Sequence, residues 1–332
     1  MGGKIAFGRA ATRRGALLGT LLSWAFLPAL GQTFPSRPIR VITPGTGGTL
    51  DHVSRGTLEA AGRLLGQPVL LEPKPGANGL LAARAVVASP PDGYSLLLVT
   101  GSALATNPSV YRNVGYDTER DLAPISLIAR TTGVLLVVHP SLPVHTVAEL
   151  VAYCRTAKTP LNYSSAGVGN AGHLMMELLS RKAGIRLTHV PYKSATAYTQ
   201  AVVTNEVQVA FVAGPPAMGF LPGGQIRAIG LAGPERLPQL PSVPTLRESG
   251  FDGADLIAWV GLFAPAGTPR DVVAALNKAI VEAQSNPELR RSMQGLLGYE
   301  MQSSTPDQLA QLLSVDLKRY GDAVRVAGIT PQ

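Results

Sequence analysis

Cysteine is almost missing from this 332-residue sequence, in which Cys154 is the single thiol. An internal disulfide needs two cysteines, so no disulfide framework holds this fold, and a zinc site built from several cysteines is excluded as well. Cys154 falls on an apolar helical face, which indicates an inert buried side chain. Aromatic residues make up only 5% of the chain, and no dense basic run is present, so nucleic-acid binding is not expected.

Signatures of catalysis and metal binding are missing too. The sequence contains no G-x-S-x-G nucleophile motif. The histidines show neither H-E-x-x-H nor another tight ligand spacing; they are His52, His139, His145, His173 and His189. We therefore expect no catalytic residues, no metal and no cofactor.

The net charge of +8 is concentrated at the N-terminus. Residues 1–31 hold four basic residues and no acid, and the rest of the chain has 25 basic against 21 acidic residues. Twelve uncharged residues, 16–27, follow the basic start, and a helix of that length is too short to cross a bilayer. Ala29-Leu30-Gly31 supplies the small residues of a cleavage site, so residues 1–31 are predicted to be a signal peptide, with Arg13-Arg14 resembling a twin-arginine signal. The mature protein is predicted to be periplasmic.

Length and pattern favour an α/β protein with two lobes. The chain exceeds what one hydrophobic core usually serves, and 45% of its residues are apolar. Short β-rich segments alternate with amphipathic ones in two runs, which is typical of parallel strands flanked by helices. The first run has strands at 39–43, 69–72 and 95–100, with helices at 50–65 and 80–87. The second has strands at 161–163, 187–190, 207–212 and 226–231, with helices at 147–154 and 174–182, and three helical segments close the chain.

Two long apolar stretches, 125–139 and 256–264, are predicted to cross between the lobes. The first lobe then comprises residues 32–135 and 257–332, and the second comprises 136–256. Each lobe is expected to hold a mostly parallel sheet, with a ligand cleft between the lobes, because ligands of open α/β sheets bind where strands end and helices begin.

The turn from Pro44 to Asp51 follows the first strand and opens the first helix. Its glycines allow backbone N–H groups to face an anion, and a helix N-terminus adds positive partial charge. Gly45 and Gly47 also match two glycines of a dinucleotide-binding motif, but Leu50 replaces the third. Binding of an anion, binding of a dinucleotide and a purely structural tight turn remain open from the residues alone. Asp51 is either a general base or an acid placed to stabilise the start of the helix.

A second turn of this kind runs from 162 to 173. Ser165 and Asn170 offer side-chain donors beside free N–H groups, although Asn170 is equally suited to cap the following helix. His173 in the first helical turn either contacts a ligand or packs as a polar residue. Residues 43–51, 100–107, 164–173 and 211–217 contain no Lys or Arg. A carboxylate held by these turns would therefore be bound by N–H and hydroxyl dipoles, not by an arginine fork.

Many short motifs in order resemble those of Bug-type periplasmic solute-binding proteins of the tripartite tricarboxylate transporter family, over nearly all of 32–332. They include Phe34-Pro35-Ser36-Arg37-Pro38-Ile39, Glu72-Pro73-Lys74-Pro75-Gly76-Ala77-Asn78-Gly79, Pro91-Asp92-Gly93-Tyr94, Asn107-Pro108-Ser109-Val110-Tyr111, Asn162-Tyr163-Ser164-Ser165-Ala166-Gly167, His189-Val190-Pro191-Tyr192-Lys193, Pro241-Ser242-Val243-Pro244-Thr245 and Ala264-Pro265-Ala266-Gly267-Thr268-Pro269. The resemblance implies a two-lobed Venus-flytrap protein that closes on a small carboxylated solute, acts as a monomer, and delivers the solute to a membrane transporter or a sensor's periplasmic domain.

The resemblance also implies which residues bind the solute. On the first lobe they are Pro44, Thr46, Gly47, Gly48, Thr49 and Asp51, with Thr100, Gly101 and Ser102 as a third wall. On the second lobe they are Ser165, Gly167, Gly169, Asn170, His173, Val212 and Ala213.

This sequence departs from the family pattern at three places. Pro44 stands where an aromatic residue is common, and Leu50 stands where a small polar residue usually precedes the Asp. Phe211-Val212-Ala213-Gly214 replaces a frequent Phe-Asp-Asn and removes an acid suited to an ammonium group. We therefore expect a ligand without positive charge. The competing class is an exported enzyme that uses Asp51 or His173 as acid–base, and a dinucleotide-dependent oxidoreductase is a third possibility.

Overall fold

The computed structural model describes residues 1–4, 34–45, 49–254, 256, 258–293 and 298–331. Residues 1–33 separate from 34–332 as a unit of their own, and most of the predicted signal peptide lies outside the described residues. Among the described helices, none combines the length and apolar character needed to span a bilayer.

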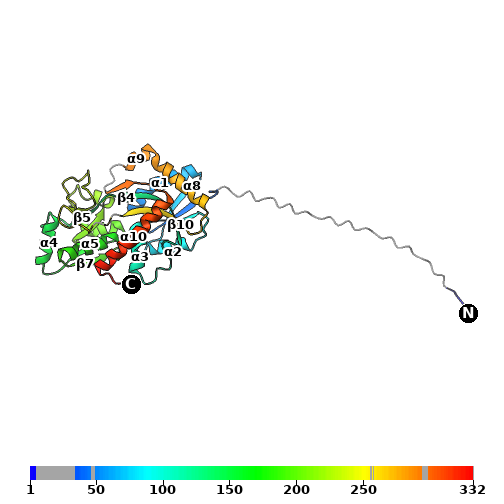
Figure 1. The fold of residues 1–332 in the computed structure, drawn as a ribbon, viewed down its shortest axis with the longest axis horizontal. Coiled ribbons are helices and arrows are strands. Elements are labelled where there is room, and N and C mark those ends of the chain that lie inside the picture. The colour runs from blue at the N-terminus through cyan, green and yellow to red at the C-terminus, as the bar shows by residue number, and fades with distance from the viewer. Residues whose placement is uncertain (5–33, 46–48, 255, 257, 294–297, 332) are drawn as a thin grey trace. The chain divides into compact units, whose positions relative to one another are not determined.

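Six strands form the first sheet, in the order β11-β4-β10-β3-β1-β2. Their bounds are β1 Ile39–Thr43, β2 Val69–Pro73, β3 Ser95–Thr100, β4 Leu122–Thr131, β10 Trp259–Pro265 and β11 Tyr299–Met301. Figure 1 labels β4 and β10 of this sheet. Strand β1 pairs in parallel with β2 and β3, whereas β10 and β11 pair antiparallel with their neighbours.

Five strands form the second sheet, in the order β7-β6-β8-β5-β9. Their bounds are β5 Val134–Val138, β6 Leu161–Ser165, β7 Leu187–Pro191, β8 Val209–Ala213 and β9 Arg227–Ala232. Strand β6 pairs in parallel with β7 and β8, and β5 pairs antiparallel with β8 and β9. The α/β class with two sheets is as expected, but both sheets are mixed rather than mostly parallel. Strands β10 and β11 of the first sheet and β5 of the second run against the parallel strands, whereas β4 and β9 run with them.

Helices cover both faces of each sheet. They are α1 Thr49–Leu65, α2 Leu80–Val87, α3 Gly101–Val110, α4 Val147–Thr156, α5 Ala171–Ala183, α6 Ala195–Val203, α7 Gly214–Met218, α8 Arg270–Ser285, α9 Pro287–Met293 and α10 Pro306–Ala327, and a 3₁₀ turn, η1, spans Ala77–Gly79. Alternate side chains of a strand enter opposite cores, as the two-residue period of a strand requires. In β3, Leu96 and Leu98 pack with α1 and α8, whereas Leu97 and Val99 pack with α2 and α10.

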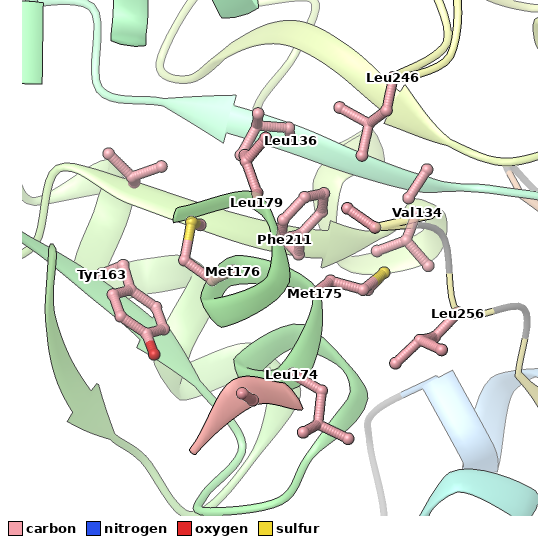
Figure 2. Close-up of a cluster of buried hydrophobic side chains, with 14 of the residues drawn as sticks. Val134, Leu136, Tyr163, Leu174, Met175, Met176, Leu179, Phe211, Leu246 and Leu256 are labelled. Atoms are coloured by element: carbon pink, nitrogen blue, oxygen red, sulfur yellow. The ribbon is translucent and has the colours of Figure 1, made fainter. Parts of the chain in front are cut away.

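The second sheet follows the same rule. Leu136 of β5 packs with α5, and Leu135 packs with α6 on the other face. Figure 2 shows Met175, Met176 and Leu179 of α5 beside Phe211 of β8. Helix α10 contributes Tyr320 to this core although it also packs on α3, so the C-terminal helix contacts helices from both halves.

The chain passes from the first sheet to the second through Thr132 and Gly133. The Thr132 amide donates to the Gly298 carbonyl at 2.8 Å, and the Thr131 amide donates to the Ala258 carbonyl at 2.8 Å. The return passage lies between β9 and β10, so two adjacent segments link the sheets. The exact limits of the two lobes remain a prediction.

Candidate functional site

The parallel strands of each sheet end at one edge, and the predicted site residues follow those ends. The last strand residues are Thr43, Pro73 and Thr100 in the first sheet, and Ser165, Pro191 and Ala213 in the second. Helices α1, α3 and α5 begin close after three of these strands, and their first N–H groups have no partner within the helix. Helix α1 contacts α7, which follows β8, so the two edges approach each other there.

The loop after β1 carries the first predicted group. Pro44 is partly exposed and lies beside Gly79. A methyl group added to Gly79 would lie 3.0 Å from the Pro44 ring. The predicted residues Thr46, Gly47 and Gly48 lie outside the described residues. Asp51 lies in the first turn of α1 and accepts from Arg55 at 2.6 Å, an (i, i+4) ion pair suited to stabilising a helix start.

The N-terminus of α3 carries the residues that were predicted to form a third wall. The Thr100 hydroxyl caps the helix by accepting from the Ala103 amide at 3.4 Å, and the Ser102 hydroxyl donates to it at 3.2 Å. Gly101 lies flat against the indole of Trp259, because a methyl there would overlap three indole carbons. The sequence therefore needs glycine at this position.

A buried carboxylate holds that indole in place. Trp259 Nε1 donates to Asp316 Oδ2 at 2.7 Å, and both residues are buried. Burial raises the pKa of Asp316 above its ordinary value, against the opposing effect of the hydrogen bond from Trp259. The first strand residue of β10 is thus fixed to α10 directly behind the start of α3.

The loop between β6 and α5 is held by its own donors. Ser165 is fully buried, and its hydroxyl lies 3.1 Å from the Gly167 carbonyl and 3.2 Å from the Gly167 amide, which donates to it. The Gly169 amide donates to His173 Nδ1 at 3.0 Å. Asn170 caps α5 by accepting from the Gly172 amide at 3.0 Å, so the capping role that the sequence left open beside ligand binding is observed. The amides of Ala166, Val168 and Ala171 take part in none of these contacts.

Two glycines give this loop its path. Gly167 has φ +121° and Gly169 has φ +77°, in the left-handed region that side chains disfavour. A methyl on Gly169 would also lie 2.8 Å from Val110, the last residue of α3. The loop of the second sheet therefore meets a helix of the first sheet at this glycine.

Two imidazoles stack beneath the same loop. The rings of His173 and His189 lie 4.0 Å apart at an angle of 5°, and Tyr163 stacks on His189 at 5.0 Å. Parallel pairing places Tyr163 opposite His189, which explains why the two rings meet. His189 Nε2 lies 2.7 Å from the Ser165 hydroxyl, and Tyr163 donates to Glu177 at 2.6 Å.

Both imidazoles are kept neutral. Burial, and secondly the neighbouring His189, lowers the pKa of His173 to about 3. Burial lowers the pKa of His189 to about 4. The other titratable groups that these contacts place beside the pair are Tyr163 and Glu177, and burial raises the pKa of Tyr163 above its ordinary range.

The end of β8 carries the last predicted residues. Val212 is fully buried in the apolar core on the α6 face of the sheet, so this side chain is a core residue. Ala213 is the N-cap of α7 and is 9% exposed.

Other parts of the described chain offer less chemistry. Cys154 is half-buried against apolar side chains, and burial raises the pKa of its thiol to about 11, as expected of an inert thiol. Among the described residues no three His, Cys, Asp or Glu side chains gather in a way that suits a metal ion. Two open grooves of about 420 Å³, one beside β9 and one around Tyr116, are not lined by predicted site residues.

Sequence reasoning missed three residues of this arrangement: His189, Trp259 and Asp316. His189 stands in a motif that carried the family resemblance, and the expected parallel strands would place it beside Tyr163 or a neighbour. Trp259 and Asp316 are 57 residues apart, and no local pattern joins them.

Comparison with known proteins agrees with this architecture. The family described as "Tripartite tricarboxylate transporter family receptor" matches residues 53–329. A protein of the UPF0065 group from Bordetella pertussis is 32% identical over 323 residues, which cover 96% of this chain and 98% of that protein.

Solved structures are similar over most of the chain. The periplasmic binding protein BugD has a TM-score of 0.84 at 28% identity, covering 90% of this chain and 100% of its own. R. palustris Rpa4515 with adipate has a TM-score of 0.85 at 30% identity, with the same two coverages. MatC from Rhodopseudomonas palustris with bound malate has a TM-score of 0.82 at 32% identity, covering 88% of this chain and 100% of its own. With the family match over most of its length, this chain belongs to the tripartite tricarboxylate transporter receptor family.

Proposed function

We propose that this protein is an extracytoplasmic receptor that captures a small organic carboxylate between its two lobes and presents it to a tripartite tricarboxylate-type transporter. The observation that carries the proposal is the pair of lysine- and arginine-free loops, each opening a helix, at the carboxyl edges of two sheets that approach each other. Backbone amides at helix starts bind anions by their partial charge. Relatives solved with adipate and with malate support a carboxylate as the ligand.

The proposed site draws on both sheets. On the first, the carboxylate is held by the loop that comprises Pro44, Thr46, Gly47, Gly48, Thr49 and Asp51, and by the α3 start at Thr100, Gly101 and Ser102. On the second, the 166–171 loop presents its uncommitted amides, while Ser165, Gly167, Gly169, Asn170 and His173 fix its shape. The end of β8 at Ala213 completes the wall, with Val212 behind it as a core residue.

Dipoles are sufficient for useful affinity. A hydrogen bond to a charged group contributes about 1.5–3 kcal/mol net. Four or five such bonds together supply roughly 6–15 kcal/mol, and the upper part of this range covers the ~8 kcal/mol of micromolar binding and part of the ordering cost. Closure follows as a population shift, because a ligand that touches both lobes binds the closed form more tightly.

The ligand is proposed to lack a positive charge. Val212-Ala213-Gly214 offers no acid to an ammonium group, and the 43–51, 100–107 and 164–173 segments hold one acid, Asp51, which is paired with Arg55. An unpaired ammonium group in such a site would lose its hydration without compensation. Dicarboxylates and monocarboxylates are therefore favoured over amino acids.

Binding without turnover is the proposed activity. His173 is buried and its Nδ1 already accepts from a backbone amide, so it is poorly placed to move a proton of a substrate. Asp51 is engaged with Arg55. The competing hypothesis, an exported acid–base enzyme, predicts turnover of the bound acid that Asp51→Asn abolishes with binding intact.

A thermal-shift screen of residues 32–332 tests the function. Trp24 and Trp259 are the two tryptophans, so this fragment reports through Trp259 alone, and its fluorescence gives a second signal. A saturating ligand should raise the melting temperature by mass action. We expect malate, succinate or adipate to do so and aspartate and glutamate to act more weakly. Preference for the amino acids would refute the charge argument, and no response to any carboxylate would refute the function.

The cellular location has its own test. We propose that the mature chain begins at Gln32 in the periplasm. N-terminal sequencing of the protein from an osmotic-shock fraction should begin at or near Gln32, and recovery of full-length protein from the cytoplasm would contradict this.

A further inference from the structure

The contacts of Ser165 fix the proton positions around it. Its oxygen meets three groups: the Gly167 amide at 3.2 Å, the Gly167 carbonyl at 3.1 Å and His189 Nε2 at 2.7 Å. A hydroxyl has one proton to donate and two lone pairs that accept. If the proton went to His189, the hydroxyl oxygen and the Gly167 carbonyl oxygen would face each other as two acceptors. All three contacts are satisfied when Ser165 donates to the Gly167 carbonyl and His189 donates from Nε2.

The second imidazole has the same tautomer for a different reason. His173 Nδ1 accepts from the Gly169 amide, so the one proton of neutral His173 is on Nε2. Protonation of Nδ1 would place two donors against each other. If His173 and His189 were both protonated, two positive charges would lie on rings only 4.0 Å apart.

We propose that His173 and His189 form a positioning pair that holds the 165–169 loop in the shape that binds a carboxylate. His189 sets the Ser165 hydroxyl, which ties down Gly167, and His173 ties down Gly169. The Gly167 amide donates to Ser165 and the Gly169 amide donates to His173, so neither is available to bind the ligand. The amides of Ala166, Val168 and Ala171 are then presented in a fixed geometry.

The stacking links these two contacts. His189 comes from β7 and His173 from α5, and Ser165 is the last residue of β6, so three elements fix the loop. Because the rings are nearly parallel at 4.0 Å, a shift of one imidazole displaces the other, and both glycines move together. A preorganised loop binds more tightly since less ordering entropy is lost on binding. This inference rests on the proposed function of the loop.

Paired substitutions test it, because amides can replace single imidazole nitrogens. His189→Gln keeps a donor near the position of Nε2, and His189→Leu removes it. His173→Asn keeps an acceptor near the position of Nδ1, and His173→Leu removes it. The matched control is His139→Leu, since His139 Nδ1 lies 2.7 Å from the Ser141 hydroxyl on the surface, away from the loop.

Affinity for malate and adipate is measured by calorimetry. Loss of one hydrogen bond in each Leu variant should weaken binding about fivefold or more. The Gln and Asn variants should stay within about threefold of the wild type, and His139→Leu should be unchanged. Leu variants that bind as the wild type does, or amide variants that bind no better than the Leu variants, would overturn the proposal.

Imidazole ¹⁵N spectra of the ligand-free wild type provide a readout that needs neither a ligand nor a variant. Both rings should carry their proton on Nε2 and stay neutral at pH 5, where a solvent-exposed imidazole is charged. A proton on Nδ1 of either ring would overturn the pair. If the spectra agree but no carboxylate binds, the proposed function fails while the geometry of the pair stands, so the two failures are distinguishable.

Discussion

Gly101→Ala should damage both stability and binding, because this glycine is where α3 rests on Trp259. A methyl at Gly101 would lie 2.5 Å from Trp259 Cδ2 and closer to two other indole carbons. Carbon atoms pack at about 3.5–4.0 Å, so the helix start or the indole must move by at least about 1 Å. Trp259 cannot recede freely, since its Nε1 is bonded to Asp316 at 2.7 Å in a buried setting.

The size of the effect follows from this overpacking. Extra methyl groups in a packed core cost about 1–3 kcal/mol of unfolding free energy. For a mature chain of this length, the melting temperature should fall by about 2–6 °C. Displacement of the α3 start would also remove about one charge-assisted hydrogen bond from a bound carboxylate, which weakens binding roughly tenfold to a hundredfold.

Urea unfolding and Trp259 fluorescence measure these effects in residues 32–332. Gly219→Ala is the control, because Gly219 has φ −72° and open space around its Cα, so alanine there should be neutral or stabilising by up to about 1 kcal/mol. If Gly101→Ala unfolds within about 0.5 kcal/mol of the wild type with unchanged indole emission, the packing argument for the third wall is wrong.

Three further predictions concern the loop and the buried carboxylate. Asn170→Ala removes the cap of α5 and should cost about 1 kcal/mol of unfolding free energy in urea. Trp259→Phe leaves the Asp316 carboxylate without its indole donor and should lower the free energy of unfolding by about 1–3 kcal/mol. If adding Asp316→Leu to this variant restores stability, the unpaired carboxylate oxygen caused the loss. The pKa of His173 is lowered to about 3 and that of His189 to about 4, so below pH 6.5 the unfolded chain binds more protons than the folded one. The stability that the two neutral imidazoles contribute is complete above pH 6.5 and is lost as the pH falls towards 4 and 3, by up to about 1.4 kcal/mol per pH unit for each histidine. Urea titrations at pH 4 to 7 should show this loss as a slope of unfolding free energy against pH. The slope should flatten in the His173→Asn, His189→Gln double variant.

Most of the secondary structure was predictable because burial and period agree in these segments. Strands β1 and β3 and helices α1 and α2 follow from runs of apolar residues with clear breaks between them. The mixed character of the sheets was not predictable in the same way, because strand direction depends on where the chain re-enters a sheet. The crossing near 132–133 is two residues long and sends β5 antiparallel to its neighbours.

Helix α3 shows why local signals failed at one wall of the site. Gly101 and Pro108 both disfavour a helix, and of this segment only residues 100–102 are predicted, as a wall of the site that the family resemblance implies. Pro108 has no amide to donate to the Leu104 carbonyl, and the Thr118 hydroxyl lies 3.5 Å from that oxygen instead. Packing against α10 and the first sheet supplies the stability that the sequence of α3 lacks.

The hydrogen bonds within the second predicted loop could not be predicted from its sequence. The 165–173 loop was expected to offer its hydroxyl, amides and imidazole to a ligand, but the contacts of Ser165, Gly169 and His173 are with each other and with His189. Which amides stay uncommitted depends on hydrogen bonds between β6, β7 and α5, and no single segment encodes them.

A site built from dipoles has a consequence for selectivity. Lysine and arginine attract any anion over a distance of about one Debye length, which salt shortens. Amides in fixed positions act only at hydrogen-bond distance, so they discriminate by the placement of carboxylate oxygens and depend little on ionic strength. In the receptor that we propose, rigid loops would supply the affinity, and glycine conformation, a helix cap and two neutral imidazoles would then matter as much as the groups that touch the solute.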